Sequence, residues 1–123
     1  MLAAAGAWMA IVPWLGRLLG LDVDVATRVE VVDHVIPGVV AAVAGLYLTR
    51  TAAGRPLASD RAAPAVAVTA LLAGLWAFAT HAPLLLDAAR GDQPWAAAIW
   101  HSVAALPILV IAFWCVLQAT ARP

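Results

Sequence analysis

Charge and cysteine are both scarce in this sequence, and each shortage excludes a class of protein. Only 11% of the residues are charged, and seven arginines balance seven acidic residues to a net charge of zero. Such a chain has no basic surface that would bind nucleic acid. Cys115 is the single cysteine and lies in an apolar run, so neither an intramolecular disulfide nor a cysteine-based metal motif is possible.

The sequence also lacks the motifs that usually indicate catalysis. It contains no glycine-rich phosphate loop, no nucleophile beside a base and no paired carboxylates for acid–base chemistry. The metal-binding spacings HxxxH and HExxH are absent as well. We therefore expect a protein that is not an enzyme and has no catalytic residues.

Apolar residues are what the chain has in excess. They make up 65% of it, whereas soluble domains are about half apolar and could not bury so much apolar surface at this length. A helix needs about 20 mostly apolar residues to cross the hydrocarbon core of a bilayer. Four stretches meet this requirement, at residues 2–21, 31–49, 64–86 and 96–119. The sequence predicts an all-α fold, a bundle of four transmembrane helices in the lipid bilayer.

The four predicted helices form two hairpins joined by a polar connector. We expect the first hairpin over residues 1–50, the connector over 51–63 and the second hairpin over 64–123. No basic residue precedes the first apolar stretch, so we expect it to be retained as a helix and not removed as a signal peptide.

Similar residues recur at nearly constant spacing in the two hairpins, which suggests an internal repeat. The matches are Gly6-Ala7-Trp8 with Gly74-Leu75-Trp76, Asp24 with Asp92, His34 with His101, and Tyr47 with Trp114. Each copy holds an even number of helices, so the copies are expected to have the same topology. They would then be related by a pseudo-two-fold axis along the membrane normal.

The first copy resembles the SPW repeat family of small bacterial membrane proteins. The resemblance rests on Gly6-x-Trp8, on Val12-Pro13-Trp14-Leu15-Gly16, and on Asp33-His34 leading into Gly38. The second copy keeps Gly74-x-Trp76 and Pro83 but departs elsewhere, and Val12 stands where the family has its namesake serine. This resemblance implies a membrane fold of two hairpins and no established biochemical activity.

The arginines predict the orientation in the membrane, because short cytoplasmic loops are enriched in Lys and Arg. One side of the predicted bundle holds Arg50, Arg55, Arg61 and Arg122, and the other holds Arg17, Arg28 and Arg90. We therefore expect both termini in the cytoplasm. Abundant alanine and the absence of lysine are typical of a GC-rich genome, so we expect a bacterial inner membrane. Trp14, Trp95 and Trp100 are expected at the outer interface.

Three histidines are the candidate cofactor-binding residues. His34 lies near the start of the second predicted helix, His81 shortly before the end of the third, and His101 shortly after the start of the fourth. Antiparallel helices bring these positions to one depth near the outer boundary. Small residues share the helix faces of all three, and such faces pack against neighbouring helices. We therefore expect the three side chains to point into the bundle and to cluster.

Several roles for this histidine layer remain open. The side chains could simply form hydrogen bonds between helices or with headgroup water. They could instead hold haem b or another macrocycle, a pigment, a metal ion, or a quinone or lipid. Asp33 could orient His34, although an N-cap of the second helix is the more common role for such an aspartate. Trp8 and Trp76 could form a platform for a flat ligand or fill space between the hairpins.

Two functions are therefore expected. The first is a structural or accessory subunit of a larger membrane complex or homo-oligomer. The alternative is a cofactor-binding subunit that uses His34, His81 and His101. A transporter or channel is less well supported, because the predicted helices carry few polar residues to line a path.

Overall fold

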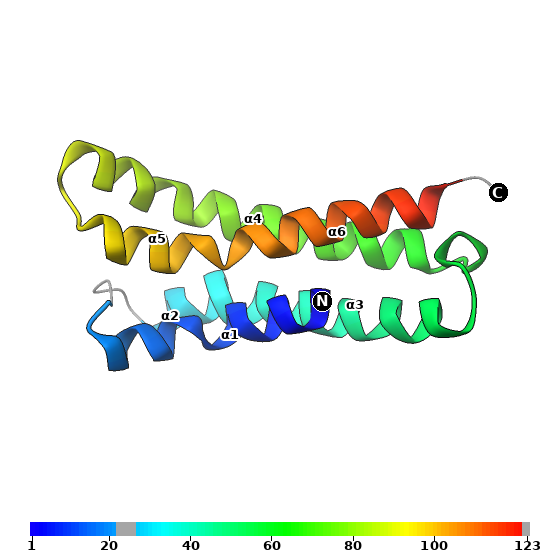
Figure 1. Ribbon diagram of the computed structural model, residues 1–123. Coiled ribbons are helices and arrows are strands. Elements are labelled where there is room, and N and C mark those ends of the chain that lie inside the picture. Colours follow the sequence, from blue (N-terminus) through cyan, green and yellow to red (C-terminus); the bar gives the residue numbers. More distant parts are fainter. Residues whose placement is uncertain (22–26, 122–123) are drawn as a thin grey trace.

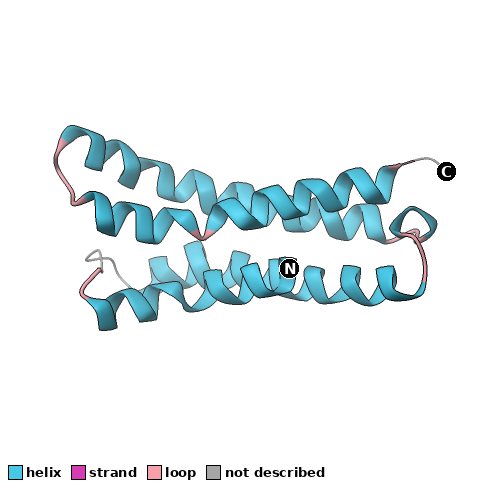
Figure 2. Cartoon of the chain, viewed as in Figure 1, coloured by secondary structure: helices cyan, strands magenta, loops and turns pink. Residues whose placement is uncertain are grey.

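Four long helical rods lie side by side in the computed structural model, which describes residues 1–21 and 27–121 (Figure 1). Nearly all of the described chain is helical (Figure 2). In chain order the elements are α1 (Leu2–Leu19), α2 (Thr27–Glu30), the π-helical turn η1 (Val31–Val35), α3 (Ile36–Gly54), the 3-10 turn η2 (Leu57–Ser59), α4 (Ala63–Arg90), α5 (Trp95–Val103) and α6 (Ala105–Thr120).

The four rods are long and apolar enough to cross a membrane. Elements α2, η1 and α3 join end to end into one rod, and so do α5 and α6. The candidate spans are Leu2–Leu19, Thr27–Gly54, Ala63–Arg90 and Trp95–Thr120. The chain is thus an integral membrane protein, and the predicted four-helix bundle is confirmed.

Two helices extend beyond the spans predicted for them. The second rod begins at Thr27, ahead of the predicted start at residue 31, so Glu30 belongs to the helix and not to the connector. For the same reason Asp33 lies inside the rod and is not its N-cap. The third rod continues past residue 86 to Arg90, where Gly91 ends it in the left-handed conformation that favours glycine.

Two prolines explain the irregular turns in the second and fourth rods. Pro37 has no N–H, and its ring crowds the carbonyl of Asp33, so the turn before it widens into η1. Pro107 acts in the same way on the carbonyl of Val103, where the fourth rod is interrupted between α5 and α6. The predicted single helix over 96–119 is therefore two shorter helices.

The hairpins are built differently. Helices α1 and α3 touch backbone to backbone, because a Cβ added at Gly6 would lie 2.4 Å from the Ala42 nitrogen and one at Gly45 would lie 2.3 Å from the Ala3 nitrogen. In the second hairpin, a Cβ at Gly74 would meet the side chain of Ile108 at 3.0 Å. The predicted small-residue face of α3 is thus the buried face. The two hairpins meet mainly where α3 packs against α4.

Candidate metal centre

The three histidines lie together near one end of the bundle. Ring centroids are 4.3 Å apart for His34 and His81, 5.5 Å for His34 and His101, and 6.4 Å for His81 and His101. Each side chain is at most 3% exposed. Their predicted clustering and inward orientation are confirmed.

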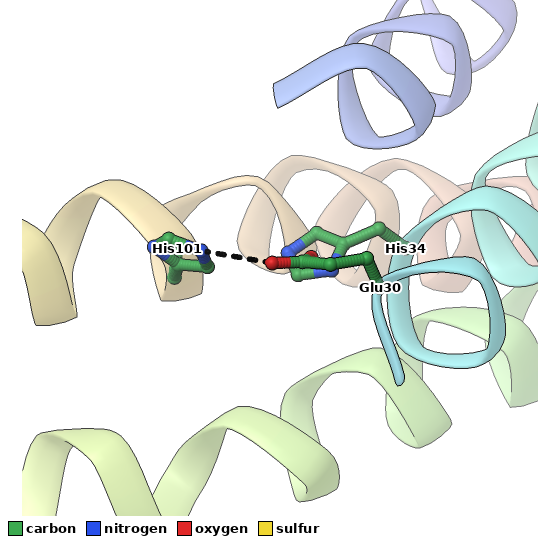
Figure 3. Close-up of side chains that lie close together, drawn as sticks. All are labelled: Glu30, His34 and His101. Carbon is green, nitrogen blue, oxygen red and sulfur yellow. Dashed lines mark ion pairs between the residues drawn. The ribbon is translucent and has the colours of Figure 1, made fainter. Parts of the chain in front are cut away.

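Glu30 is a fourth member of this cluster, and sequence reasoning missed it. Its side chain is 1% exposed. One carboxylate oxygen, Oε2, lies 3.0 Å from His34 Nδ1, and the other, Oε1, lies 3.7 Å from His101 Nε2 (Figure 3). The signal was present in the sequence, because Glu30 and His34 have the i, i+4 spacing that places two side chains on one helix face.

The local backbone of the second rod helps to place His34. Residues Val31–Val35 form the π-helical turn that relieves the clash with Pro37, and this turn carries both Asp33 and His34. Single π-turns inside α-helices are uncommon and are often found at functional sites. The extra residue in this turn changes the helical spacing between Glu30 and α3. His34 nevertheless lies on the same buried helix face as Gly38 and Ala41.

Backbone carbonyls determine which ring nitrogen of His81 carries a proton. His81 Nδ1 lies 2.6 Å from the carbonyl oxygen of Ala77, which can only accept, so this nitrogen is the donor. The Nε2 atom of a neutral His81 is then an acceptor. It lies 2.9 Å from His34 Nε2, so His34 must donate from that atom. A neutral His34 therefore turns the lone pair of its Nδ1 toward Glu30.

The same reasoning applies to His101. Its Nδ1 lies 3.3 Å from the carbonyl oxygen of Ala97 and donates to it, so Nε2 of the neutral ring presents a lone pair. That lone pair also faces Glu30. When both rings are neutral, two imidazole lone pairs and a carboxylate, all electron-pair donors, thus converge without a hydrogen atom between them.

The atoms at this point of convergence have no hydrogen-bond partner in the described part of the chain. They are Oε1 and Oε2 of Glu30, Nδ1 of His34 and Nε2 of His101, all buried. Glu30 Oε2 and His34 Nδ1 are close enough for a hydrogen bond or an ion pair, which needs a proton between them. Leaving a buried polar group without a partner costs about 1–3 kcal/mol, and more for a charged group. The cluster therefore lacks a positively charged centre.

A transition-metal ion fits this arrangement. One ligand atom from each of Glu30, His34 and His101 lies within 4.8 Å of the other two. In a tetrahedral site with bonds of about 2.0–2.1 Å, neighbouring ligand atoms are about 3.3 Å apart. The contacts of 3.0 and 3.7 Å lie on either side of that spacing.

The surroundings of the ligand atoms also suit a metal ion. Histidine ligands usually donate their other ring N–H to a carbonyl or carboxylate, which fixes the ring. His101 does so through Ala97. His34 does so through His81, which in turn donates to Ala77. A metal ion held in this way would leave His81 as a positioning residue, whereas the sequence predicts it, with the other two, as a direct ligand-binding residue.

The adjoining cavity is small. Its volume is about 90 Å³, and it is lined by the four cluster residues together with Val29, Asp33, Thr80 and Leu84. Sites for organic ligands usually enclose about 300–1,000 Å³. This volume favours a single ion with a water molecule over the predicted alternatives of haem, a pigment or a quinone.

The tryptophans differ in how far they are buried. Trp8 and Trp76 are 40% and 54% exposed, so they form no platform inside the bundle. Trp100 is partly buried and donates its Nε1 hydrogen to the carbonyl oxygen of Val12 at 3.2 Å. This bond joins α5 to α1 close to His101. Trp14 and Trp95 are both exposed, as expected for an aromatic belt.

Comparison with known proteins identified no relative. No protein-family model matches the chain, and no curated protein or solved structure matches it either. The resemblance to the SPW repeat family and the internal repeat therefore stay predictions. What the cluster does has to be inferred from its own chemistry.

Proposed function

We propose that this protein is a small membrane subunit that binds one divalent first-row transition-metal ion inside its bundle. Glu30, His34 and His101 are the ligands. The observation that carries this proposal is the convergence of four buried polar atoms, two carboxylate oxygens and two imidazole nitrogens, that have only one another to bond with among the described residues. Imidazole suits zinc, copper, iron and nickel, and a carboxylate with two imidazoles is a donor set for zinc or iron(II).

A metal ion explains the cluster better than a purely structural role does. A buried carboxylate is normally retained only when it is paired or coordinates a metal. Among the described ion pairs, only the two imidazoles lie beside Glu30, and each imidazole, when neutral, turns a lone pair toward it. A divalent ion would neutralise the carboxylate and fill both lone pairs at once.

The wider role proposed here is that of an accessory subunit without catalytic activity. Its partners would be other membrane proteins or further copies of the chain, in a bacterial inner membrane. Outside the four spans, the described connectors are short and contain no folded domain, so docking would have to occur through the helices. A distant relation to the SPW repeat family fits a small membrane protein of this kind.

Metal analysis of the protein purified in mild detergent tests the proposed function. After removal of bound metal and titration with Zn²⁺ or Co²⁺, we expect one ion per chain for the wild type. His101→Ala should lose this ion, whereas Asp87→Asn, on α4 outside the cluster, should keep it. The proposal is wrong if the wild type binds neither ion, because the cluster would then hold only a shared proton.

Orientation can be tested separately with reporter fusions. Fusions after Thr51 and at the C-terminus should report the cytoplasm, and a fusion at Gly91 should report the outside. In the structure the α3–α4 connector and the C-terminal end lie at one end of the bundle, and the α4–α5 turn lies at the other (Figure 1). A cytoplasmic signal from the Gly91 fusion would reverse the proposed orientation.

A further inference from the structure

We infer that the metal centre has an open coordination position, which a water molecule or another small protic ligand occupies from the adjoining cavity. This inference rests on the proposed function, and it goes further by assigning a site for an exogenous ligand. Structural zinc sites are usually closed by four protein ligands, whereas three protein ligands plus an open position are typical of sites that bind and activate small molecules.

Among the described histidine, cysteine, aspartate and glutamate side chains, three bring their ligand atoms together and no fourth joins that group. His81 Nε2 is already the acceptor for His34. The hydroxyl of Thr80 contacts the Ala77 carbonyl and His81 Nδ1 at 3.1 Å each. Asp33 lies on the cavity wall, and its carboxylate does not belong to the group of mutually close ligand atoms.

The cavity lies where the missing ligand would be. All three proposed metal ligands contribute to its wall, so it adjoins the point at which their donor atoms converge. Its volume of about 90 Å³ exceeds the space that one water molecule needs and is too small for an organic substrate. The cavity therefore admits only small ligands.

The polar groups on the wall indicate the kind of ligand. Asp33 and Thr80 both line the cavity, and their side-chain oxygen atoms are able to accept hydrogen bonds from a ligand that carries O–H or N–H. A carboxylate close to the open position also disfavours anions. Water and other small neutral protic molecules are thus favoured over small anions.

Azide binding to the Co²⁺-loaded protein tests the open position, because azide coordinates where water can and changes the visible absorption of cobalt. We expect a response in the wild type and about fivefold tighter azide binding in Asp33→Asn, which removes a nearby negative charge. Leu84→Trp should fill the cavity and abolish the response while Co²⁺ still binds. Leu75→Trp, at a 48% exposed position of the same helix, should behave like the wild type.

The outcomes separate the two proposals. If Co²⁺ does not bind to the wild type, the proposed function itself is wrong. If Co²⁺ binds but azide changes no spectrum in the wild type or in Asp33→Asn, the position is closed and this inference is wrong. A changed cobalt spectrum in Asp33→Asn without azide would make Asp33 the fourth ligand and would also overturn it. An undiminished azide response in Leu84→Trp would place the azide outside the cavity.

Discussion

Two buried acidic residues lie toward opposite ends of the bundle, and they differ in how they are neutralised. Asp60 follows η2 in the α3–α4 connector, and Glu30 lies in the same rod as α3 but at its other end. The exposed fractions are 6% for Asp60 and 1% for Glu30. Both therefore need partners within the protein.

Asp60 finds all of its partners in the chain. Its Oδ1 accepts hydrogen bonds from the Tyr47 hydroxyl at 3.0 Å and from the backbone N–H groups of Ala62 and Ala63 at 2.8 and 3.1 Å. Its Oδ2 pairs with the guanidinium of Arg55. The Ala62 N–H, followed by the Arg55 and Tyr47 contacts, lowers the pKa of this carboxyl despite its burial.

Glu30 has no such set of donors. Its two neighbours are imidazole nitrogens, which present lone pairs when the rings are neutral, and among the described residues no backbone N–H or arginine bonds to either oxygen. The difference shows how to distinguish a structural polar cluster from a binding site. The Asp60 cluster is complete and holds a connector in place, whereas the Glu30 cluster becomes complete only when a cation is added.

The largest effect is expected from Gly45→Leu, which disturbs the helix pair that supports both clusters. A Cβ at this position would already lie 2.3 Å from a backbone nitrogen of α1, so the longer side chain must separate α1 from α3. We expect loss of a cooperative thermal transition in detergent. Val43→Leu, at a position 62% exposed on the same helix, is the control and should leave the transition unchanged.

Glu30→Gln should affect metal binding and stability in opposite directions. Loss of a residue that hydrogen-bonds to a metal ligand lowers metal affinity about 10- to 100-fold. Loss of a ligand itself should therefore lower metal affinity by more than that. Without metal, however, the variant should unfold at a higher temperature than the metal-free wild type, because an uncompensated buried charge has been removed. Calorimetry of both proteins with and without Zn²⁺ measures the two effects. A less stable metal-free variant would mean that Glu30 is structurally satisfied like Asp60.

His81→Ala should weaken metal binding less than Glu30→Gln does. The variant keeps all three proposed ligands but removes the acceptor that holds His34 Nε2–H, so affinity should fall about 10- to 100-fold. His81→Gln offers an amide oxygen in place of the ring nitrogen and should recover part of this loss. Competition with a coloured zinc chelator measures the affinities. Complete loss of binding in both variants would make His81 a ligand.

Asp60→Asn should lower thermal stability and leave metal binding unchanged, the reverse of Glu30→Gln. Because the folded-state pKa of Asp60 lies below its ordinary value of 3.8, its stabilising effect is present above that pH and is lost as the pH falls through the lower folded-state value. The stability difference between wild type and variant should therefore be full at neutral pH and diminish below about pH 4. A difference that stays constant down to pH 2 would contradict this account.

The sequence predicted the histidine layer but not its carboxylate. The bounds of the apolar stretches predict that His34, His81 and His101 lie at one depth. Small residues on the same helix faces predict that their side chains point into the bundle. Both predictions follow from regular helix geometry. Glu30 was assigned to a connector because the polar residues around it hid the helix start at Thr27. The π-turn before Pro37 depends on how the clash between the Pro37 ring and the preceding helical turn is relieved. The pattern of hydrophobic residues cannot predict this.

The Asp60 cluster could not be predicted for a different reason. Its donors come from the end of α3, from the connector and from the first turn of α4, and they meet only because η2 folds the connector back. No local pattern fixes such a loop. The interruption of the fourth rod at Ala104 could not be predicted either. Pro107 is accommodated there by a break in the helix, whereas Pro13 and Pro83 lie within continuous helices.

Locating the metal directly is the decisive measurement. Crystals of the Zn²⁺-loaded protein, with anomalous diffraction recorded at the zinc edge, would show the ion as a single peak. Our account predicts that peak within about 2.0–2.2 Å of a Glu30 carboxylate oxygen, His34 Nδ1 and His101 Nε2. A peak bound elsewhere on the protein, or no peak in protein saturated with zinc, would contradict it.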